Sequence, residues 1–273
     1  MKPLIHIRPL ENSEIEIASN LLPIEWDFKQ GQLLSNYPEN EVYRAFGGFL
    51  EGKLVCFGDV IINKDSGWLG NIVVSADFRT NGFGQAISLF LVNYLKEVNC
   101  RTIHTMASDI TKINYKKIGF LTSSVYCVLK GNLLISSSNN QNIRLLEEKD
   151  LDQVYNLDYK ATHEDRSELL KKSVSGGWVY FSLEENTITG FFLPNCDEGP
   201  VIASEVKARL QLLQLKYSIS LKDAVIPCEN KAAVDFLKNN HYRETGMIYR
   251  MVIGDDLNLN QEMIFSRAGR FGA

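Results

Sequence analysis

A short loop in the first half of the chain carries the clearest chemical signal in the sequence. It reads Arg79-Thr80-Asn81-Gly82-Phe83-Gly84, between an apolar run that ends at Val74 and apolar residues that recur at helical spacing. Glycine lets a backbone approach a ligand closely, and the first turn of a helix presents unpaired N–H groups and a positive dipole end. Arg79 adds a fixed positive charge, and Thr80 and Asn81 offer side-chain hydrogen bonds. The loop is therefore a candidate pyrophosphate site.

Two glycines before a helix can also form a tight turn that binds nothing, and the loop alone does not separate these interpretations. No Gly-Lys-Ser/Thr follows it, as it would in a P-loop NTPase. The three-glycine pattern of dinucleotide-binding folds and their downstream ribose-binding acid are also missing. The sequence excludes those two classes of phosphate-binding fold.

A second motif, Tyr115-Lys116-Lys117-Ile118-Gly119-Phe120, lies downstream of the loop. Together with the segment from Val74 to Gly84, it resembles the GNAT superfamily of acyl-CoA-dependent N-acyltransferases. Members of that family carry Arg/Gln-x-x-Gly-x-Gly/Ala after an apolar strand and Tyr-x-x-x-Gly-Phe further on. The resemblance implies that acetyl-CoA is the co-substrate and that the middle of the domain is a splayed sheet.

The resemblance also assigns residues to the co-substrate. The backbone of Ile72, Val73 and Val74 would hold the pantetheine arm. The pyrophosphate would lie against Arg79, Thr80, Asn81, Gly82, Phe83 and Gly84. Ser108 stands where members often have Asn near the adenine end. Tyr115 falls where many members carry the general acid that protonates the departing CoA thiolate, although a phenol on an amphipathic helix can also be a packing residue.

The amine to be acylated must lose a proton, and a carboxylate or a water held by one is the usual base. Asp59 is an acid where a strand pattern expects a hydrophobe, so it is either a site residue or faces solvent. Glu25 and Asp27 flank Trp26 in a stretch that commonly lines the acceptor cleft in this family. We take Asp59 and Glu25 as candidate bases and Trp26 and Asp27 as candidate substrate contacts, with an exposed loop as the alternative.

Hydrophobic periodicity and turn residues predict a mixed α/β order for the first half. The expected elements are strand 5–7, a helix from 12, strands 43–49, 54–62 and 67–74, a helix from 84, strand 102–106, helix 109–117 and strand 120–130.

An uncharged polar run at 136–142 separates two halves of similar length, which share motifs at both ends. Ile7-Arg8-Pro9-Leu10-Glu11 matches Ile143-Arg144-Leu145-Leu146-Glu147, and the segment 108–120 matches 230–242. These matches predict a degenerate duplication. No segment of the second half corresponds to the glycine loop, because the turn at Gly199-Pro200 is expected to run straight into a helix.

The second half therefore resembles the shortened copy of a bacterial tandem GNAT group, which walls the acceptor pocket. Leu237 and His241 replace the Tyr and Gly of the first copy. Arg166, beside Asp165, is a candidate substrate clamp, because a guanidinium binds carboxylates through two bonds. A local ion pair or a helix cap is the alternative.

Composition limits the partners. The 273-residue chain is 45% hydrophobic and 23% charged with a net charge of −4, and it has no long basic run, so nucleic acid is not an expected partner. No apolar stretch is long enough to span a bilayer, and the first residues resemble a strand rather than a signal peptide. The five cysteines are widely spaced and are expected to be buried, reduced thiols, and no metal site is expected.

We therefore expect an α/β (α+β) protein with two GNAT-like domains, each a mixed, mostly antiparallel splayed sheet flanked by helices. Residues 1–135 would be the catalytic domain, 136–142 the linker and 143–273 the degenerate copy. The predicted function is a cytoplasmic N-acetyltransferase, monomeric or homodimeric, that acts on a small-molecule amine or on a protein N-terminus or lysine. The alternatives are an acyl-CoA-binding sensor and a pseudoenzyme scaffold.

Overall fold

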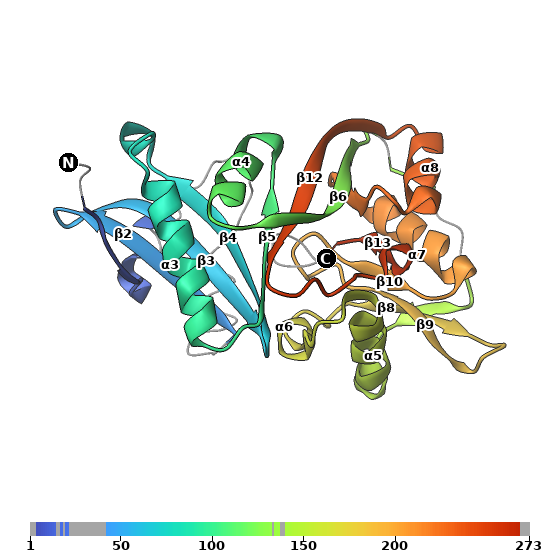
Figure 1. Cartoon of the computed structure of the whole chain (residues 1–273). Helices are drawn as coiled ribbons and strands as arrows, with labels where there is room; N and C mark the ends of the chain where they lie inside the picture. Colours follow the sequence, from blue (N-terminus) through green and yellow to red (C-terminus); the bar gives the residue numbers. More distant parts are fainter. Residues whose placement is uncertain are drawn as a thin grey trace. The chain divides into compact units, whose positions relative to one another are not determined.

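The computed structural model describes residues 4–14, 17–18, 20–21, 42–132, 134–136 and 140–267. The chain divides into two compact units (Figure 1). The first comprises Met1–Thr105, Ile113–Leu121 and Val252–Asp255, and the second comprises Met106–Lys112, Thr122–Met251 and Asp256–Ala273. The chain passes between the units more than once, so these units are not the two consecutive domains 1–135 and 143–273. Those predicted domain limits describe two copies in the sequence, and they stay a prediction.

The first unit is built on strands in the order β1-β2-β3-β4-β5. These are β1 (His6–Pro9), β2 (Tyr43–Leu50), β3 (Lys53–Asn63), β4 (Ser66–Val74) and β5 (Thr102–Ala107). Pairing is antiparallel from β1 to β4 and parallel between β4 and β5. The turn between β2 and β3 has positive φ at Glu51 (49°) and Gly52 (81°), which is the backbone of the tightest hairpins.

Helices pack on this sheet because their apolar residues recur at three- and four-residue intervals. The long helix α3 (Phe83–Glu97) buries Ile87, Leu91 and Leu95 and lies against β3 and β4. The short helix α4 (Asp109–Lys117) has the bounds that its polar start and apolar spacing predict. Two single turns, η1 (Asn12–Glu14) and η3 (Ala76–Phe78), also lie in this half.

The second unit contains strands in the order β12-β6-β11 and a five-stranded sheet in the order β13-β10-β9-β8-β7. Their bounds are β6 (Leu121–Lys130), β7 (Ile143–Leu145), β8 (Trp178–Ser182), β9 (Thr187–Phe192), β10 (Val201–Ala203), β11 (Ala224–Pro227), β12 (Arg243–Ile253) and β13 (Ile264–Ser266). The helical segments are η4 (Glu148–Asp150), α5 (Leu151–Thr162), α6 (Ser167–Lys171), α7 (Val206–Ile219), α8 (Lys231–Asn239) and η5 (Gln261–Met263).

Alternation along the short strand β10 divides the core of the second unit. Val201 and Ala203 belong to the apolar cluster that contains residues of α7. Ile202, between them, belongs to the cluster that contains residues of α5. Successive side chains of a strand point to opposite faces, so the two helices cover opposite faces of this sheet. The predicted fold class, a mixed α/β protein with mostly antiparallel sheets flanked by helices, is confirmed.

The same local contacts occur near the start of both sequence halves. Arg8 donates to the two carboxylate oxygens of Glu14 at 2.7 and 2.6 Å, and Arg144 donates to those of Asp150 at 2.6 and 2.9 Å. In each half the same carboxylate also accepts the backbone N–H three residues before it. The bidentate bond to Arg8 lowers the pKa of Glu14 to about 2. The offset between the two arginines, 144 minus 8, is the 136 residues of the sequence match.

A second set of contacts recurs at the ends of α4 and α8. The Phe120 N–H donates to the Tyr115 carbonyl at 3.1 Å, and the Tyr242 N–H donates to the Leu237 carbonyl at 3.0 Å. The residue before each aromatic has a positive φ, 102° in the first half and 67° in the second. The offset here, 242 minus 120, is 122 residues, as in the second sequence match.

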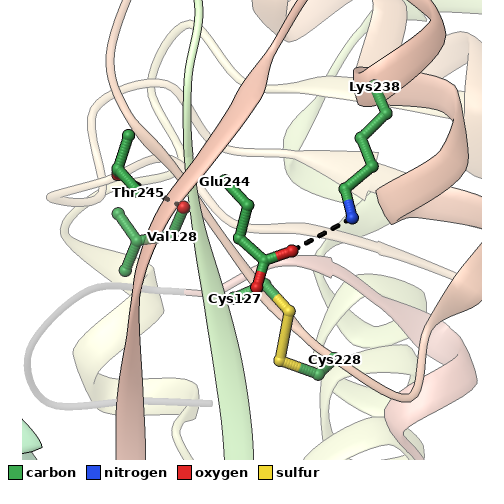
Figure 2. The surroundings of a disulfide bond; sticks show 6 residues. All are labelled: Cys127, Val128, Cys228, Lys238, Glu244 and Thr245. Carbon is green, nitrogen blue, oxygen red and sulfur yellow. Dashed lines mark hydrogen bonds and ion pairs between the residues drawn. A yellow bond between two sulfur atoms is a disulfide. The ribbon is translucent and has the colours of Figure 1, made fainter.

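The structure corrects two expectations. The Gly199-Pro200 turn does not run straight into a helix, because β10 lies between it and α7. The cysteines are not all reduced, since Cys127 and Cys228 form a disulfide (Figure 2). The disulfide joins positions 101 residues apart and depends on the antiparallel pairing of β6 with β11. The spacing of the cysteines in the sequence therefore did not reveal this bond.

The other three cysteines, Cys56, Cys100 and Cys196, are free and buried, as predicted. Burial raises the pKa of Cys56 to about 12, of Cys100 to about 11 and of Cys196 to about 12, so these thiols stay protonated. Within the described residues, no His, Cys, Asp and Glu side chains group in a way that could hold a metal ion. None of the helices described is long and apolar enough to cross a membrane.

Candidate functional site

The centre of the first unit contains a splay between two parallel strands. Pairing of β4 with β5 joins Ser66 to Thr102, Gly67 to Ile103 and Trp68 to His104. Beyond this pairing β4 continues to Val74, still paired on its other side with β3. In the described part of the chain, pairing between β4 and β5 stops at Trp68. Ile72, Val73 and Val74 therefore lie on a strand segment whose edge β5 does not cover.

The glycine loop follows this segment directly. The turn η3 lies between Val74 and the loop, and the Arg79 side chain donates from Nε to the Val74 carbonyl at 3.3 Å. The Thr80 hydroxyl donates to the Arg79 carbonyl at 2.6 Å, and the Asn81 amide donates to the Phe78 and Arg79 carbonyls, both at 3.2 Å. Thr80 and Asn81 thus shape the turn with their own side chains.

The loop ends at the start of α3. Gly82 is the N-cap residue, with φ of 86° and ψ of 5°, a left-handed conformation that glycine adopts without a steric penalty. Its carbonyl accepts the first helical hydrogen bond, from the Ala86 N–H at 3.0 Å. A Cβ placed on Gly84 would have one neighbour within 4 Å among the described residues, Val74 Cγ2 at 3.5 Å. The backbone at Gly84 therefore has open space beside it.

Tyr115 lies in the last turn of α4 and is 9% exposed. Its ring packs edge-on against Phe120, with centroids 5.5 Å apart. Burial raises the pKa of the Tyr115 phenol, and the nearby Thr105 hydroxyl opposes only part of that rise. The phenol therefore stays protonated at neutral pH, which is the state that a general acid requires.

Asp59 is fully buried, so the suggestion that it faces solvent is wrong. The Tyr43 hydroxyl donates to it at 2.8 Å, and the Asn71 amide donates to its two oxygens at 3.1 and 2.9 Å. Neither Asn71 nor Tyr43 was predicted as a site residue. A signal for Asn71 was present in the sequence, since it is an asparagine within the apolar run 67–74. A buried carboxylate is expected to have a polar partner, and the next strand can supply one.

Three predicted residues, Glu25, Trp26 and Asp27, lie outside the described residues. Ser108 caps α4, since its hydroxyl accepts the Thr111 N–H at 3.3 Å and its N–H donates to Thr111 Oγ1 at 2.9 Å. Its predicted adenine contact stays a prediction.

Arg166 is 1% exposed and donates to both oxygens of Asp158, at 2.9 and 2.6 Å. The partner expected from the sequence, Asp165, instead accepts from the Ser167 hydroxyl at 2.6 Å. Adjacent residues do not face each other, whereas the end of α5 presents Asp158 to Arg166. The local ion pair is therefore present, with a different partner.

Comparison with known proteins shows which family the region with the splay and the loop is similar to. The model of the Acetyltransferase (GNAT) family matches residues 11–121. This part of the chain is therefore similar to the GNAT acetyltransferases. The predicted resemblance to the GNAT superfamily is thus confirmed for this part of the chain. The matched region includes the glycine loop, the splay of β4 and β5 and the Tyr115 motif.

Solved structures share the fold of most of the chain. One is a candidate acetyltransferase from Pyrococcus horikoshii, with 18% identity, a TM-score of 0.79, and coverage of 96% of this chain and 93% of that one. Another is a GCN5-related N-acetyltransferase from Sphaerobacter thermophilus, with 12% identity, a TM-score of 0.58, and coverage of 92% and 97%. At these identities the likeness concerns the fold alone. No curated protein sequence matches the chain.

Proposed function

We propose that the chain is an N-acetyltransferase that transfers the acetyl group of acetyl-CoA to an amine by direct attack. The observation that carries the proposal is the continuity of three features: the uncovered edge of β4, the loop from Arg79 to Gly84 and the start of α3. A strand edge suits the amide groups of a pantetheine arm, and a helix start behind glycine suits a pyrophosphate.

Each residue group has a role in this proposal. The backbone of Ile72, Val73 and Val74 holds the pantetheine arm, the loop Arg79–Gly84 binds the pyrophosphate, and Ser108 lies toward the adenine. In the reaction the acceptor nitrogen bonds to the carbonyl carbon, the carbon–sulfur bond breaks, and the departing thiolate takes the proton of Tyr115. The open space at Gly84 and the burial of Tyr115 fit these roles.

The acceptor is proposed to be a small-molecule amine or a protein N-terminus or lysine. Glu25 is the candidate proton acceptor, because the Tyr43 and Asn71 hydrogen bonds to Asp59 suit that second candidate less well. Trp26, Asp27 and Arg166 are candidate acceptor contacts. Arg166 can take that role only if its buried pairing with Asp158 changes. We place the enzyme in the cytoplasm as a monomer or homodimer.

We further propose one CoA site per chain, with the second half as a degenerate copy. The recurrence of the Arg8 and Arg144 contacts and of the α4 and α8 helix ends supports the duplication. Where α3 begins after Gly82, α7 begins after Glu205, whose carboxylate accepts from the Thr189 hydroxyl at 3.0 Å. A carboxylate at this helix start repels phosphate, so α7 is unsuited to bind CoA.

Reversing the charge of Arg79 tests the loop. We expect Arg79→Glu to weaken acetyl-CoA binding by about tenfold or more, because a charge-assisted hydrogen bond contributes about 1.5–3 kcal/mol. Isothermal titration calorimetry measures the dissociation constant. The matched control is Arg243→Glu, an exposed charge reversal on β12. Equal affinities for the Arg79 variant and the wild type would remove the loop assignment.

The two glycines of the loop are expected to respond differently to alanine. Gly82→Ala should destabilise the protein by about 1–2 kcal/mol, because Ala disfavours the left-handed conformation. Gly84→Ala should leave stability unchanged or raise it, since its Cβ meets only Val74 at 3.5 Å and Ala favours helix. Acetyl-CoA binding should fall about tenfold in Gly82→Ala, because the loop loses the left-handed turn that begins α3. It should stay within about twofold of wild type in Gly84→Ala, because the family motif has Gly or Ala at this position. Thermal unfolding and calorimetry measure the two effects, and equal affinities for Gly82→Ala and the wild type would contradict the proposal.

The alternatives predict other outcomes in a single assay. Release of free thiol from acetyl-CoA, dependent on an added amine, is expected of the transferase. A non-catalytic sensor would bind CoA tightly without releasing thiol. A pseudoenzyme scaffold would not bind CoA. The assay should use a fixed mixture of a polyamine, an amino acid and a short peptide, because the acceptor is unidentified.

A further inference from the structure

The pairing of β3 with β4 contains a bulge beside the splay. Phe57 lies opposite Val73, whereas Asp59 lies opposite Gly70. Two steps along β3 thus match three along β4, so β4 carries one extra residue between Gly70 and Val73. Bulges bend a strand, redirect its residues and are common next to active sites. This one lies past Trp68, on the segment that β5 leaves uncovered and that leads to the loop.

Asn71 occupies the bulge in a strained conformation. Its φ is 48°, in the left-handed region that asparagine and glycine tolerate better than other residues. Its side-chain amide donates to both oxygens of Asp59, at 3.1 and 2.9 Å, and both residues are at most 5% exposed. A buried carboxylate is costly without hydrogen bonds, so Asp59 favours the backbone conformation that brings the Asn71 amide to it.

This arrangement suits Asp59 to a role other than the general base. A base needs a lone pair that faces the acceptor nitrogen. The Asn71 amide reaches both oxygens of Asp59, and the Tyr43 hydroxyl also donates to one of them at 2.8 Å. The Asn71 hydrogen bonds hold the Asp59 carboxylate against the bulge of β4.

We propose that Asp59 and Asn71 are positioning residues that hold the β4 bulge in the geometry required for acetyl transfer. The inference rests on the proposed function and concerns the same strand segment. Asp59 acts through Asn71 on the backbone of β4 rather than on the acceptor. Losing the pair should lower turnover more than it lowers affinity for acetyl-CoA, because the loop from Arg79 to Gly84 remains.

Two substitutions at position 71 separate the hydrogen bond from the backbone conformation. Asn71→Gly keeps easy access to a positive φ but removes the amide, whereas Asn71→Ala loses both. We expect both variants to lower kcat about tenfold, with the acetyl-CoA dissociation constant within about twofold of wild type. Asn71→Ala should also unfold at a lower temperature than Asn71→Gly. Asn93→Ala, on an exposed position of α3, is the control and should match the wild type.

Asp59→Asn distinguishes positioning from proton abstraction. The variant keeps the shape of the side chain but weakens its hydrogen bonds with Asn71 and Tyr43, so we expect kcat to fall about tenfold. The acidic limb of the pH profile of kcat/KM should persist, because in this proposal that limb belongs to another group. Disappearance of that limb would make Asp59 the base and overturn the proposal. Unchanged kcat in Asp59→Asn and Asn71→Gly would overturn it as well.

Hydrogen exchange tests the same pair without turnover. Amides in the segment Gly70–Val73 should exchange about tenfold faster in Asp59→Asn and Asn71→Gly than in wild type, because the hydrogen bonds between Asp59 and Asn71 no longer hold the bulge. Unchanged exchange would show that the pair does not hold the bulge. If the wild type released no thiol from acetyl-CoA, the proposed function would fail, while faster exchange in the variants would still show the structural role of the pair.

Discussion

Tyr115→Phe should lower kcat by about 100-fold or more while the dissociation constant of acetyl-CoA stays within about twofold of wild type. General acid catalysis contributes about 10²- to 10⁴-fold to rate, and the substitution removes only the hydroxyl. The buried ring would keep its edge-on contact with Phe120, at 5.5 Å between centroids, so stability should change little. Steady-state thiol release, calorimetric titration and thermal unfolding measure these three quantities.

The pH dependence follows from the environment of the phenol. Burial raises the pKa of Tyr115, so the acid remains protonated from neutral pH to beyond the ordinary titration of tyrosine. The wild-type rate should therefore show no loss of this acid up to about pH 10. Tyr94→Phe, the same change on α3, is the matched control and should retain full activity. If Tyr115→Phe were as active as this control, Tyr115 would be a packing residue and the acid would be another group.

Local patterns predicted most of the first half, because its contacts are short-range in sequence. The strands 43–49, 54–62 and 67–74 appear as β2, β3 and β4 with bounds shifted by a residue, and tight turns connect them. A strand pattern and the two glycines predicted the loop, and Ser108 predicted the start of α4. Each of these features depends on residues within a few positions of one another.

The features that the sequence did not reveal depend on register or on distant partners. Period-two alternation left Asp59 either in the site or toward solvent, and only the extra residue of β4 explains why Asn71 reaches it. Arg166 pairs with Asp158 because α5 ends between them, which spacing alone did not predict. Such contacts require knowledge of which strand or helix face meets which neighbour.

The disulfide joins residues that are far apart in the sequence, and we expect it to have a large effect on the stability of the folded state. Cys127 lies on β6 and Cys228 follows β11, where its N–H donates to the Val125 carbonyl at 2.9 Å. The bond closes a loop of 101 residues within the chain. In the chain-entropy model, closing a loop of about 100 residues stabilises the folded state by about 4.7 kcal/mol.

The surroundings of the bond indicate what remains after its reduction. Lys238 and Glu244 form an ion pair of 3.0 Å beside it, and the Thr245 hydroxyl donates to the Val128 carbonyl at 3.3 Å (Figure 2). The ion pair is partly exposed, so it contributes at most about 1 kcal/mol. These contacts, with the pairing of β6 and β11, preserve the local fold without replacing the stabilisation from the covalent bond.

We therefore expect a thiol reductant to lower the free energy of unfolding of the wild type by about 4 kcal/mol, measured by urea titration. The double variant Cys127→Ala with Cys228→Ala should show the same loss and no response to reductant. Cys100→Ala should respond to reductant as the wild type does, because its thiol is unpaired. Disulfides are rare in the reducing cytoplasm, so an enzyme placed there would work in its less stable dithiol form. Identical unfolding with and without reductant would show that the two thiols are not joined in solution.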